Sequence, residues 1–184
     1  MIWTAVGPLI EKQGARRLTM RRAAAVSYLS VGCLYYYFPD KRSLLLFGLD
    51  AEALQRACAD FNARFDHLRE RDPAAATEEF IRFLAGMISF MRPSVLAALE
   101  LGAGDFMSRF EANARMLQDS FLEKLALVLP DADNRDLDMV TRSLHHVRLA
   151  AMLDRSITET QLEHEIRAVL AGVPVGRVPA LSAR

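Results

Sequence analysis

The stretch Leu18–Lys41 reads LTMRRAAAVSYLSVGCLYYYFPDK and contains two short helix patterns separated by a four-residue turn. Thr19 and Ser30 are typical N-cap residues, because their hydroxyl groups accept hydrogen bonds from the free amides of a first helical turn. Pro39 ends the second pattern, since the residue before a proline disfavours helix. Together with a helix before Gly14, this spacing predicts a helix-turn-helix, a motif that places its second helix in the major groove of DNA.

The predicted helix after Ser30 has the composition of a recognition helix. Its first residues, through Cys33, are small, so its N-terminus can approach base edges, and Gly32 allows the closest backbone approach. Three successive tyrosines follow, and because consecutive residues point to different sides of a helix, at least one must face DNA or solvent. Lys41 opens the next predicted helix, where its ammonium adds to the anion-attracting field of free backbone amides.

The charge distribution separates this region from the rest of the chain. Lys plus Arg (23) equals Asp plus Glu (23) over all 184 residues. Residues 1–46, however, contain seven basic and two acidic residues, and residues 47–184 contain 16 and 21. The arginines at 16, 17, 21 and 22 could form an ordinary solvated surface, but beside a helix-turn-helix we expect them to contact phosphates.

Outside the motif the chain predicts an all-α fold, because apolar residues recur at helical spacing and no sustained alternation indicates a strand. The first helix ends at Gly14, and Pro8 either kinks it or lies in its first turn, with a start near Gly7. After the motif we expect one long helix from Lys41 to about Arg69. Further helices are predicted at about 73–92, 94–103, 105–129, 135–155 and 158–171, with a break at Pro93 and an irregular end at 172–184.

Several classes of protein are disfavoured. Cys33 and Cys58 match no metal or redox spacing, and no catalytic motif is recognisable. The adjacent His145 and His146 point about 100° apart on a helix and cannot share one metal as an i, i+4 pair would. No apolar run approaches the ~20 residues of a membrane span, and the N-terminal residues do not predict a secretory signal. We expect a cytoplasmic protein that is not an enzyme and that needs no metal, cofactor or membrane.

Residues 5–50 resemble the N-terminal DNA-binding domain of the TetR family of bacterial transcriptional regulators. The resemblance rests on Leu18-Thr19-Met20-Arg21, on the segment from Ser30 to Lys41, and on Leu44-Leu45. It implies that Leu34 and Phe38 belong to the core. Motif and resemblance together give the DNA-binding candidates Thr19, Arg21, Ser30, Val31, Gly32, Cys33, Tyr35, Tyr36, Tyr37 and Lys41.

For the rest of the chain, the resemblance implies a domain at 47–184 with an apolar effector cavity and a dimer interface. The helix-turn-helix domain would occupy 1–46, and the long helix from Lys41 would couple the two. Methionine and phenylalanine at helical spacing are more often core than ligand contacts, so the effector-binding candidates are few: Met87, Phe90, Met91, Phe106, Phe110, Phe121 and His145. A homodimer would form through the helices at about 135–155 and 158–171. The predicted function is a repressor released from double-stranded operator DNA by a small apolar effector.

The turn departs from the family pattern, because Tyr28 replaces the usual glycine. A positive φ there would cost about 1–2 kcal/mol, and the chain also lacks the family's frequent basic N-terminal arm, which would weaken phosphate binding. These departures favour an alternative, a helical small-molecule-binding or protein-interaction dimer with weakened or lost DNA binding. A turn that exposes residues 30–33 favours the regulator, whereas a turn that buries them favours the alternative.

Overall fold

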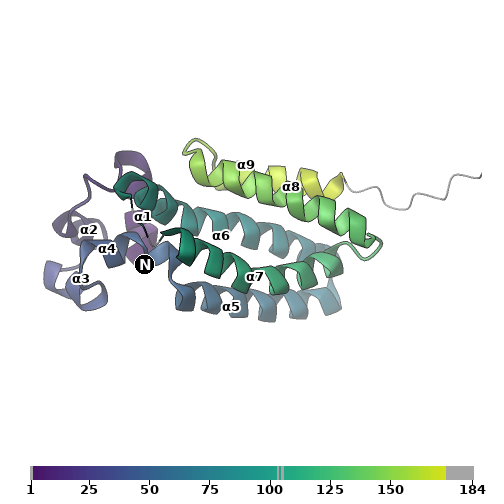
Figure 1. Cartoon of the computed structure of the whole chain (residues 1–184). Coiled ribbons are helices and arrows are strands. Elements are labelled where there is room, and N and C mark those ends of the chain that lie inside the picture. Colours follow the sequence, from purple (N-terminus) through teal and green to yellow (C-terminus); the bar gives the residue numbers. More distant parts are fainter. Residues whose placement is uncertain (1, 103, 105, 173–184) are drawn as a thin grey trace, which may run out of the picture.

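The computed structural model of the chain describes residues 2–102, 104 and 106–172 and confirms the all-α prediction. These residues form helices joined by turns and short loops, with no strand among them (Figure 1). The helices are α1 (Ile2–Gln13), α2 (Met20–Val26), α3 (Val31–Tyr37), α4 (Lys41–Leu45), α5 (Ala51–Arg71), α6 (Pro73–Leu101), α7 (Phe106–Val128), α8 (Asn134–Leu153) and α9 (Glu159–Ala171), with a 3₁₀ turn, η1, at Phe47–Leu49. An irregular end is predicted at 172–184, and residues 173–184 of it lie outside the described residues.

The short helices α1 to α4 gather at one end of the molecule, and the longer helices α5 to α9 form a bundle beside them (Figure 1). Helix α6 contacts α1, α4, α5, α7, α8 and α9. Two groups of buried side chains form the core, one from Trp3 to Leu45 and one that begins at Leu46. Ala97 of α6 belongs to the first group, so the two cores meet along α6. The division of the chain at 46/47 into two domains stays a prediction.

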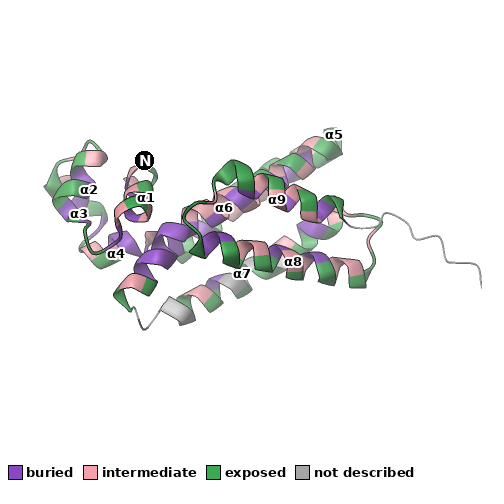
Figure 2. Ribbon diagram, turned by 90° about the horizontal axis from the view of Figure 1, so that it is seen from above, coloured by how far each residue is buried: buried purple, intermediate pink, exposed green. Residues whose placement is uncertain are grey.

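Helix α6 does not break at Pro93, so the predicted boundary between 92 and 94 is wrong. A proline inside a helix costs about 3 kcal/mol through a lost amide donor and a clash with the carbonyl of residue i−4. Here the surrounding packing outweighs that cost, because every residue from 91 to 98 is buried (Figure 2). The Trp3 indole N–H also donates to the Phe90 carbonyl at 2.9 Å, which bonds this part of α6 to α1.

By length and composition α6 is the one helix in the described part of the chain that could cross a membrane. Its most apolar window is 56% buried inside the protein. A helix that is apolar on all sides is also what the centre of a helical core requires, and the contacts of α6 place it there.

The predicted long helix from Lys41 to Arg69 is also wrong, because the chain is interrupted between α4 and α5. Asp50 caps α5 by accepting a hydrogen bond from the Ala53 amide at 2.9 Å. Before it, the Ser94 hydroxyl of α6 accepts from the Gly48 amide at 2.9 Å and donates to the Leu45 carbonyl at 2.7 Å. These buried contacts supply hydrogen-bond partners for backbone groups between α4 and α5. A continuous helix would have paired such groups within itself.

Helix α1 begins at Ile2 and continues through Pro8, so the alternative start near Gly7 is wrong. Its predicted end is confirmed: Gly14 has φ 84° and its amide donates to the Ile10 carbonyl at 2.8 Å. Only glycine adopts this left-handed conformation without steric cost.

Gly48→Ala is expected to lower the free energy of unfolding by about 1–3 kcal/mol, the usual cost of forcing an extra carbon into a packed core. A Cβ at this position would lie 2.6 Å from the Phe90 carbonyl oxygen and 2.8 Å from Ser94 Oγ. Urea unfolding of both variants measures the effect, with Gly86→Ala as the matched control, because its nearest neighbour, Glu159 Oε1, is 3.8 Å away. The control should be neutral or up to ~1 kcal/mol more stable, as alanine favours helix. Equal stability of the two variants would contradict this account of the α4–α5 interruption.

Candidate DNA-binding surface and effector cavity

Side-chain caps fix the starts of α2 and α3, the two helices of the predicted helix-turn-helix. Thr19 Oγ1 accepts a hydrogen bond from the Arg22 amide at 3.2 Å, and Ser30 Oγ accepts from the Cys33 amide at 3.0 Å. Both predicted helix starts are therefore confirmed. Asp40 caps α4 in the same way, since its carboxylate accepts from the Ser43 amide at 2.6 Å.

Tyr28 occupies the left-handed position of the turn between α2 and α3. Its φ is 56°, and it is the only non-glycine residue with positive φ in the described part of the chain. The Leu29 amide donates to the Ala24 carbonyl at 2.9 Å and the Tyr28 amide to the Ala25 carbonyl at 3.2 Å, the hydrogen-bond pair of a Schellman helix end. The tyrosine thus adopts the backbone conformation of a turn glycine, with its side chain 96% exposed.

The turn leaves the start of α3 accessible. Ser30, Val31 and Gly32 are exposed and Cys33 is half-buried. A Cβ at Gly32 would meet only Ser30 Oγ, at 4.0 Å, so the protein itself leaves open the space that a close DNA contact would use. Leu34 is buried, as the resemblance implies for a core residue.

The three tyrosines of α3 all project from the protein. Tyr35, Tyr36 and Tyr37 are 48%, 85% and 57% exposed, whereas Phe38, which follows them, is buried in the N-terminal core. A run of exposed aromatic rings with phenolic hydroxyls has no packing role that accounts for it. Phosphate or base contact would use both the rings and the hydroxyls.

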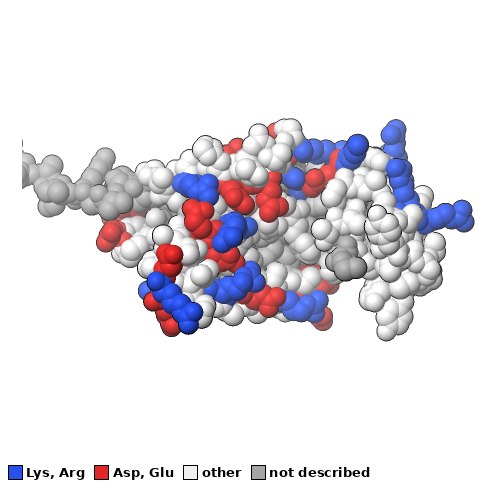
Figure 3. All heavy atoms as spheres, turned by 180° about the vertical axis from the view of Figure 1, so that it is seen from behind, with Lys and Arg blue, Asp and Glu red and all other residues white. Residues whose placement is uncertain are grey.

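Exposed basic side chains of α2 and of the loop after α1 lie at the same end of the molecule as α3. In Figure 3 they project from the N-terminal end of the face shown, whereas acidic and basic side chains alternate over the body. Arg16, Arg17, Arg21 and Arg22 are exposed, as is Thr19. Lys41 is half-buried, and its Nζ donates to the Arg16 carbonyl at 3.2 Å. The lysine therefore joins the loop after α1 to the start of α4.

Glu100 fastens the same loop to α6. Its carboxylate accepts from the amides of Ala15 at 2.7 Å and Arg16 at 3.0 Å. Burial by itself would raise the pKa of Glu100, but the two amides and the charge of Arg16 lower it overall. Sequence analysis missed this residue, because 84 positions separate it from Arg16 and no local signal predicts the contact.

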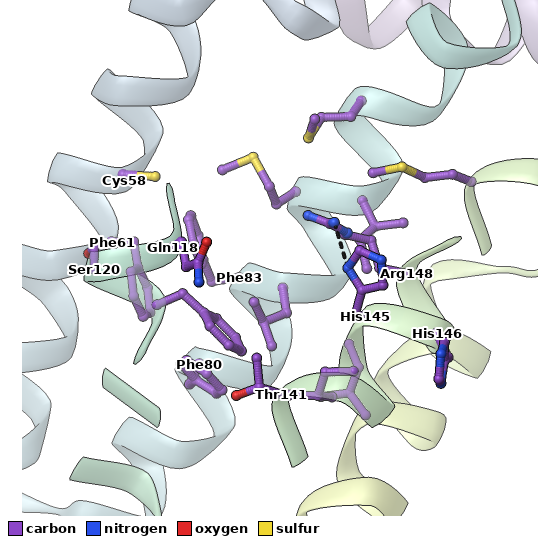
Figure 4. A pocket seen from close by; sticks show the side chains of 18 of the residues that line it. Cys58, Phe61, Phe80, Phe83, Gln118, Ser120, Thr141, His145, His146 and Arg148 are labelled. Atoms are coloured by element: carbon purple, nitrogen blue, oxygen red, sulfur yellow. Dashed lines mark hydrogen bonds between the residues drawn. The ribbon is translucent and has the colours of Figure 1, made fainter. Parts of the chain in front are cut away.

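A cavity of about 410 Å³ lies within the bundle, lined mainly by apolar side chains of α5, α6, α7 and α8 (Figure 4). This volume lies within the ~300–1,000 Å³ typical of ligand sites. Four predicted effector residues line it, namely Met87, Met91, Phe121 and His145. Two others do not: Phe90 packs against Trp3 and Phe47, and Phe110 lies beneath the Arg148 guanidinium. The side chain of Phe106 lies outside the described residues.

The polar lining of the cavity includes the predicted His145 and two residues that sequence analysis missed, Thr141 and Arg148. Thr141, His145 and Arg148 lie at i, i+4 and i+7 of α8 and so share one face of the helix. An Arg148 N–H donates to His145 Nδ1 at 3.0 Å (Figure 4). Helical spacing of polar residues in the predicted helix 135–155 was the available signal. That spacing alone could not show that this face of α8 lines a cavity.

Burial and charge affect the ionisation of this group. Burial, and then the charges of Arg148 and His146, lower the pKa of His145, so its imidazole is neutral at pH 7 and can accept a hydrogen bond from the arginine at Nδ1. Burial also lowers the pKa of Arg148, but a guanidinium remains protonated at any physiological pH. Among the described residues, no cluster of three His, Cys, Asp or Glu side chains could hold a metal ion.

A buried arginine, Arg92, connects the cavity-bearing helices to the N-terminal end. It belongs to α6 and forms an ion pair with Glu11 of α1, with Nε to Oε1 at 2.9 Å. Its Nη1 donates to the Ile157 carbonyl at 2.8 Å and to the Ala151 carbonyl of α8 at 3.4 Å. Arg155 Nη1 adds a hydrogen bond to the Glu11 carbonyl at 3.1 Å. The loop after α8 is therefore bonded to α1 directly, and α8 itself is linked to α1 through Arg92.

No protein-family model and no curated protein sequence matches the chain. Solved structures do match over nearly the whole length. A transcriptional regulator of the TetR/AcrR family from Aquifex aeolicus superposes with a TM-score of 0.58 at 17% identity, over 92% of this chain and 95% of that one. The TetR-family regulator PfmR from Thermus thermophilus gives 0.53 at 16% identity, over 94% and 98%. The chain has the TetR fold.

The superantigen PfiT matches equally well, with a TM-score of 0.54 at 19% identity over 92% of this chain and 93% of that one. The TetR fold therefore also occurs in a protein that is named for another activity. Because one fold can carry different functions, function must be argued from the exposed start of α3, the basic residues around it and the cavity.

Tyr28→Gly is expected to stabilise the TetR fold of this chain by about 1 kcal/mol, because glycine adopts positive φ without the clash of a Cβ atom. Chemical denaturation measures the change. Tyr36→Gly is the matched control: its ring is 85% exposed, but it lies inside α3, so glycine should cost about 0.5–1 kcal/mol there. A loss of stability in both variants would show that Tyr28 is not strained.

Proposed function

We propose that the chain is a homodimeric, cytoplasmic TetR-like transcriptional regulator without enzymatic activity, a repressor that leaves double-stranded operator DNA when a small apolar effector occupies the cavity. The observation that carries the proposal is the accessible start of α3. A strained turn holds residues 30–33 outward, beside three exposed tyrosines and several arginines. A helix with small residues at an exposed N-terminus suits major-groove reading, and the flanking basic groups suit phosphate contact.

DNA contact is assigned to the predicted residues, with α3 as the recognition helix. Ser30, Val31, Gly32, Cys33 and Tyr36 would face the groove or its backbone edges. The phosphate backbone would be contacted by Thr19, Arg21, Tyr35, Tyr37 and Lys41. Because Lys41 Nζ already donates to the Arg16 carbonyl, it is held near the position where a phosphate would pass, and its other N–H groups can donate to such a phosphate.

Effector response would pass through Arg92 rather than along one long helix. The cavity is lined by α6 and α8, and Arg92 links both helices to Glu11 of α1. An effector that binds better when α6 and α8 are rearranged would shift the population toward a conformation in which α1, and with it α3, is displaced. In a dimer such a displacement changes the separation of the two recognition helices and so their fit to two half-sites.

The dimer is assigned to α8 and α9, which pack on α6 and keep one face outward. On α8 the exposed face carries Met139, Leu149 and Leu153, which are 42%, 38% and 61% exposed. On α9 it carries Thr160, His164 and Ala168, at i, i+4 and i+8. Exposed apolar side chains on α8 suit packing against a second copy.

The alternative, a helical ligand-binding or interaction dimer that has lost DNA binding, is favoured by the strain at Tyr28 and by the shared fold of a superantigen. The exposed start of α3 favours the regulator. DNA binding separates the two directly.

Fluorescence anisotropy with the chain's own upstream intergenic DNA and a scrambled duplex, at two salt concentrations, tests the proposal. We expect tighter binding to the upstream DNA that survives the higher salt. In Lys41→Ala, affinity for all DNA sequences should fall and the slope of log K against log [salt] should decrease by about one, the loss of one phosphate contact.

Arg69→Ala is the matched control, since it removes one exposed positive charge from the last turn of α5, at the opposite end of that helix from α4. It should leave the salt slope unchanged. Equal, salt-sensitive binding to both duplexes would favour the alternative, and an unchanged slope in Lys41→Ala would remove that lysine from the phosphate contacts.

Leu149→Asp is expected to weaken self-association by about 10- to 30-fold, because it would place a charge in the apolar centre of the dimer contact. Sedimentation equilibrium measures the dissociation constant. Leu122→Asp on α7 is the control, since Leu122 is 37% exposed, as Leu149 is at 38%, but lies outside α8 and α9. A dimer unaffected by Leu149→Asp, or disrupted equally by both, would place the interface elsewhere.

A further inference from the structure

Arg148 is a half-buried cation without a carboxylate partner among the described residues. Its Nε is fully buried and finds no acceptor in the described part of the chain. Its described contacts are His145 Nδ1 at 3.0 Å and the Phe110 ring, whose centroid lies 5.5 Å from the guanidinium carbon. A neutral imidazole and an aromatic face balance a full positive charge only in part, and a charge withdrawn from water without compensation is costly.

The cavity around Arg148 is otherwise suited to an apolar molecule. Its described lining contains four phenylalanines and three methionines, and no Asp or Glu: Phe61, Phe80, Phe83, Phe121, Met87, Met91 and Met152. Thr141, two turns before Arg148 on α8, has a buried hydroxyl that also lacks a partner among the described residues. Its side chain lies beside the phenylalanine end of the cavity (Figure 4). The cavity is therefore largely apolar, and its described lining includes the cation Arg148, whose buried Nε has no acceptor among the described residues.

The two arginines inside the bundle, Arg92 and Arg148, differ in whether a counter-ion lies beside them among the described residues. Arg92 has Glu11 as a counter-ion and carbonyl groups for its other N–H donors. Arg148 has no such counter-ion among the described residues, although its Nε is buried. The charge of Arg92 is thus balanced within the protein, whereas that of Arg148 has no counter-ion among the described residues.

We infer that the ligand of this cavity is an apolar carboxylic acid, whose carboxylate pairs with Arg148 beside His145 and whose hydrocarbon part lies among the phenylalanine and methionine side chains. The inference rests on the proposed function, in which this cavity binds the effector. Arginine suits the task, because its planar guanidinium presents parallel N–H donors to the two oxygens of a carboxylate.

Isothermal titration of the full chain with decanoate and 1-decanol tests the inference, since the two probes share a ten-carbon chain and differ in the anionic group. The pair 4-phenylbutyrate and 4-phenylbutanol repeats the comparison on an aromatic skeleton. We expect the carboxylate of at least one pair to bind about tenfold or more tightly than its alcohol, the effect of a charge-assisted pair shielded from water.

In Arg148→Met, which keeps an apolar side chain of similar length, the affinity for the preferred carboxylate should fall about tenfold or more while that for the alcohol changes less than about threefold. Arg148→Lys keeps the charge and should retain the preference for the carboxylate. Arg142→Met is the matched control: Arg142 also lines the cavity but is exposed, and its Nε donates to the Asp138 carbonyl of its own helix at 3.4 Å. It should leave all affinities within about threefold.

Three outcomes would overturn the inference: equal binding of acid and alcohol in both pairs, loss of both members in Arg148→Met, or a preference for the acid that survives Arg148→Met. Equal binding would leave the apolar effector cavity of the proposed function intact. No binding of any of the four probes would contradict both the inference and the effector part of that proposal, while the operator titration decides DNA binding independently.

Discussion

The segment of α6 from 91 to 98 is the constraint on which the rest of the structure depends, because every one of its residues is buried and several provide polar contacts to other elements. Ser94 bonds the chain between α4 and α5, Arg92 pairs with Glu11 of α1, and the Phe90 carbonyl just before the segment accepts from Trp3. A helix surrounded on all sides must satisfy its polar groups inside the protein. Here it does so by bonding to the N-terminal helices, and the same bonds hold the candidate DNA-binding end against the bundle.

Arg92 and Arg148, the two arginines inside the bundle, differ in the partners that balance their charge. Arg92 is compensated by a carboxylate and by carbonyl oxygens, so removing any partner would leave a buried charge unpaired. Arg148 lies in a cavity with a neutral histidine and an aromatic ring. Because both arginines contact α8 or belong to it, the helix that lines the cavity also connects, through the Ala151 carbonyl, to the ion pair with α1. Coupling between an occupied cavity and the α3 surface would require only this short chain of contacts.

Tyr28 combines an unfavourable backbone conformation with a position on the exposed surface that is proposed to bind DNA. The turn uses a left-handed conformation that glycine adopts freely, yet the residue there is a fully exposed tyrosine. Strain of this kind persists where surrounding contacts fix the backbone, and the Schellman hydrogen bonds together with the buried Leu34 do so here. The tyrosine ring contributes nothing to the core, and its position beside α3 places it on the surface that would meet DNA.

The sequence by itself determined the all-α class, the helix starts at Thr19, Ser30 and Asp40, and the exposed character of α3, because caps, prolines and helical periodicity act over a few residues. It also predicted four of the cavity residues, of which Met87, Met91 and Phe121 are apolar residues at helical spacing and the fourth is His145. Only the tertiary structure decided that α6 runs through Pro93, that the chain breaks between α4 and α5, and that Phe90 belongs to a cluster with Trp3 rather than to the cavity. Each of these depends on groups distant in sequence, whose packing and buried hydrogen bonds outweigh local propensity. Arg148 belongs to the same class: its helical position was predictable, whereas the burial of its Nε with no counter-ion among the described residues follows from how α8 packs on the bundle.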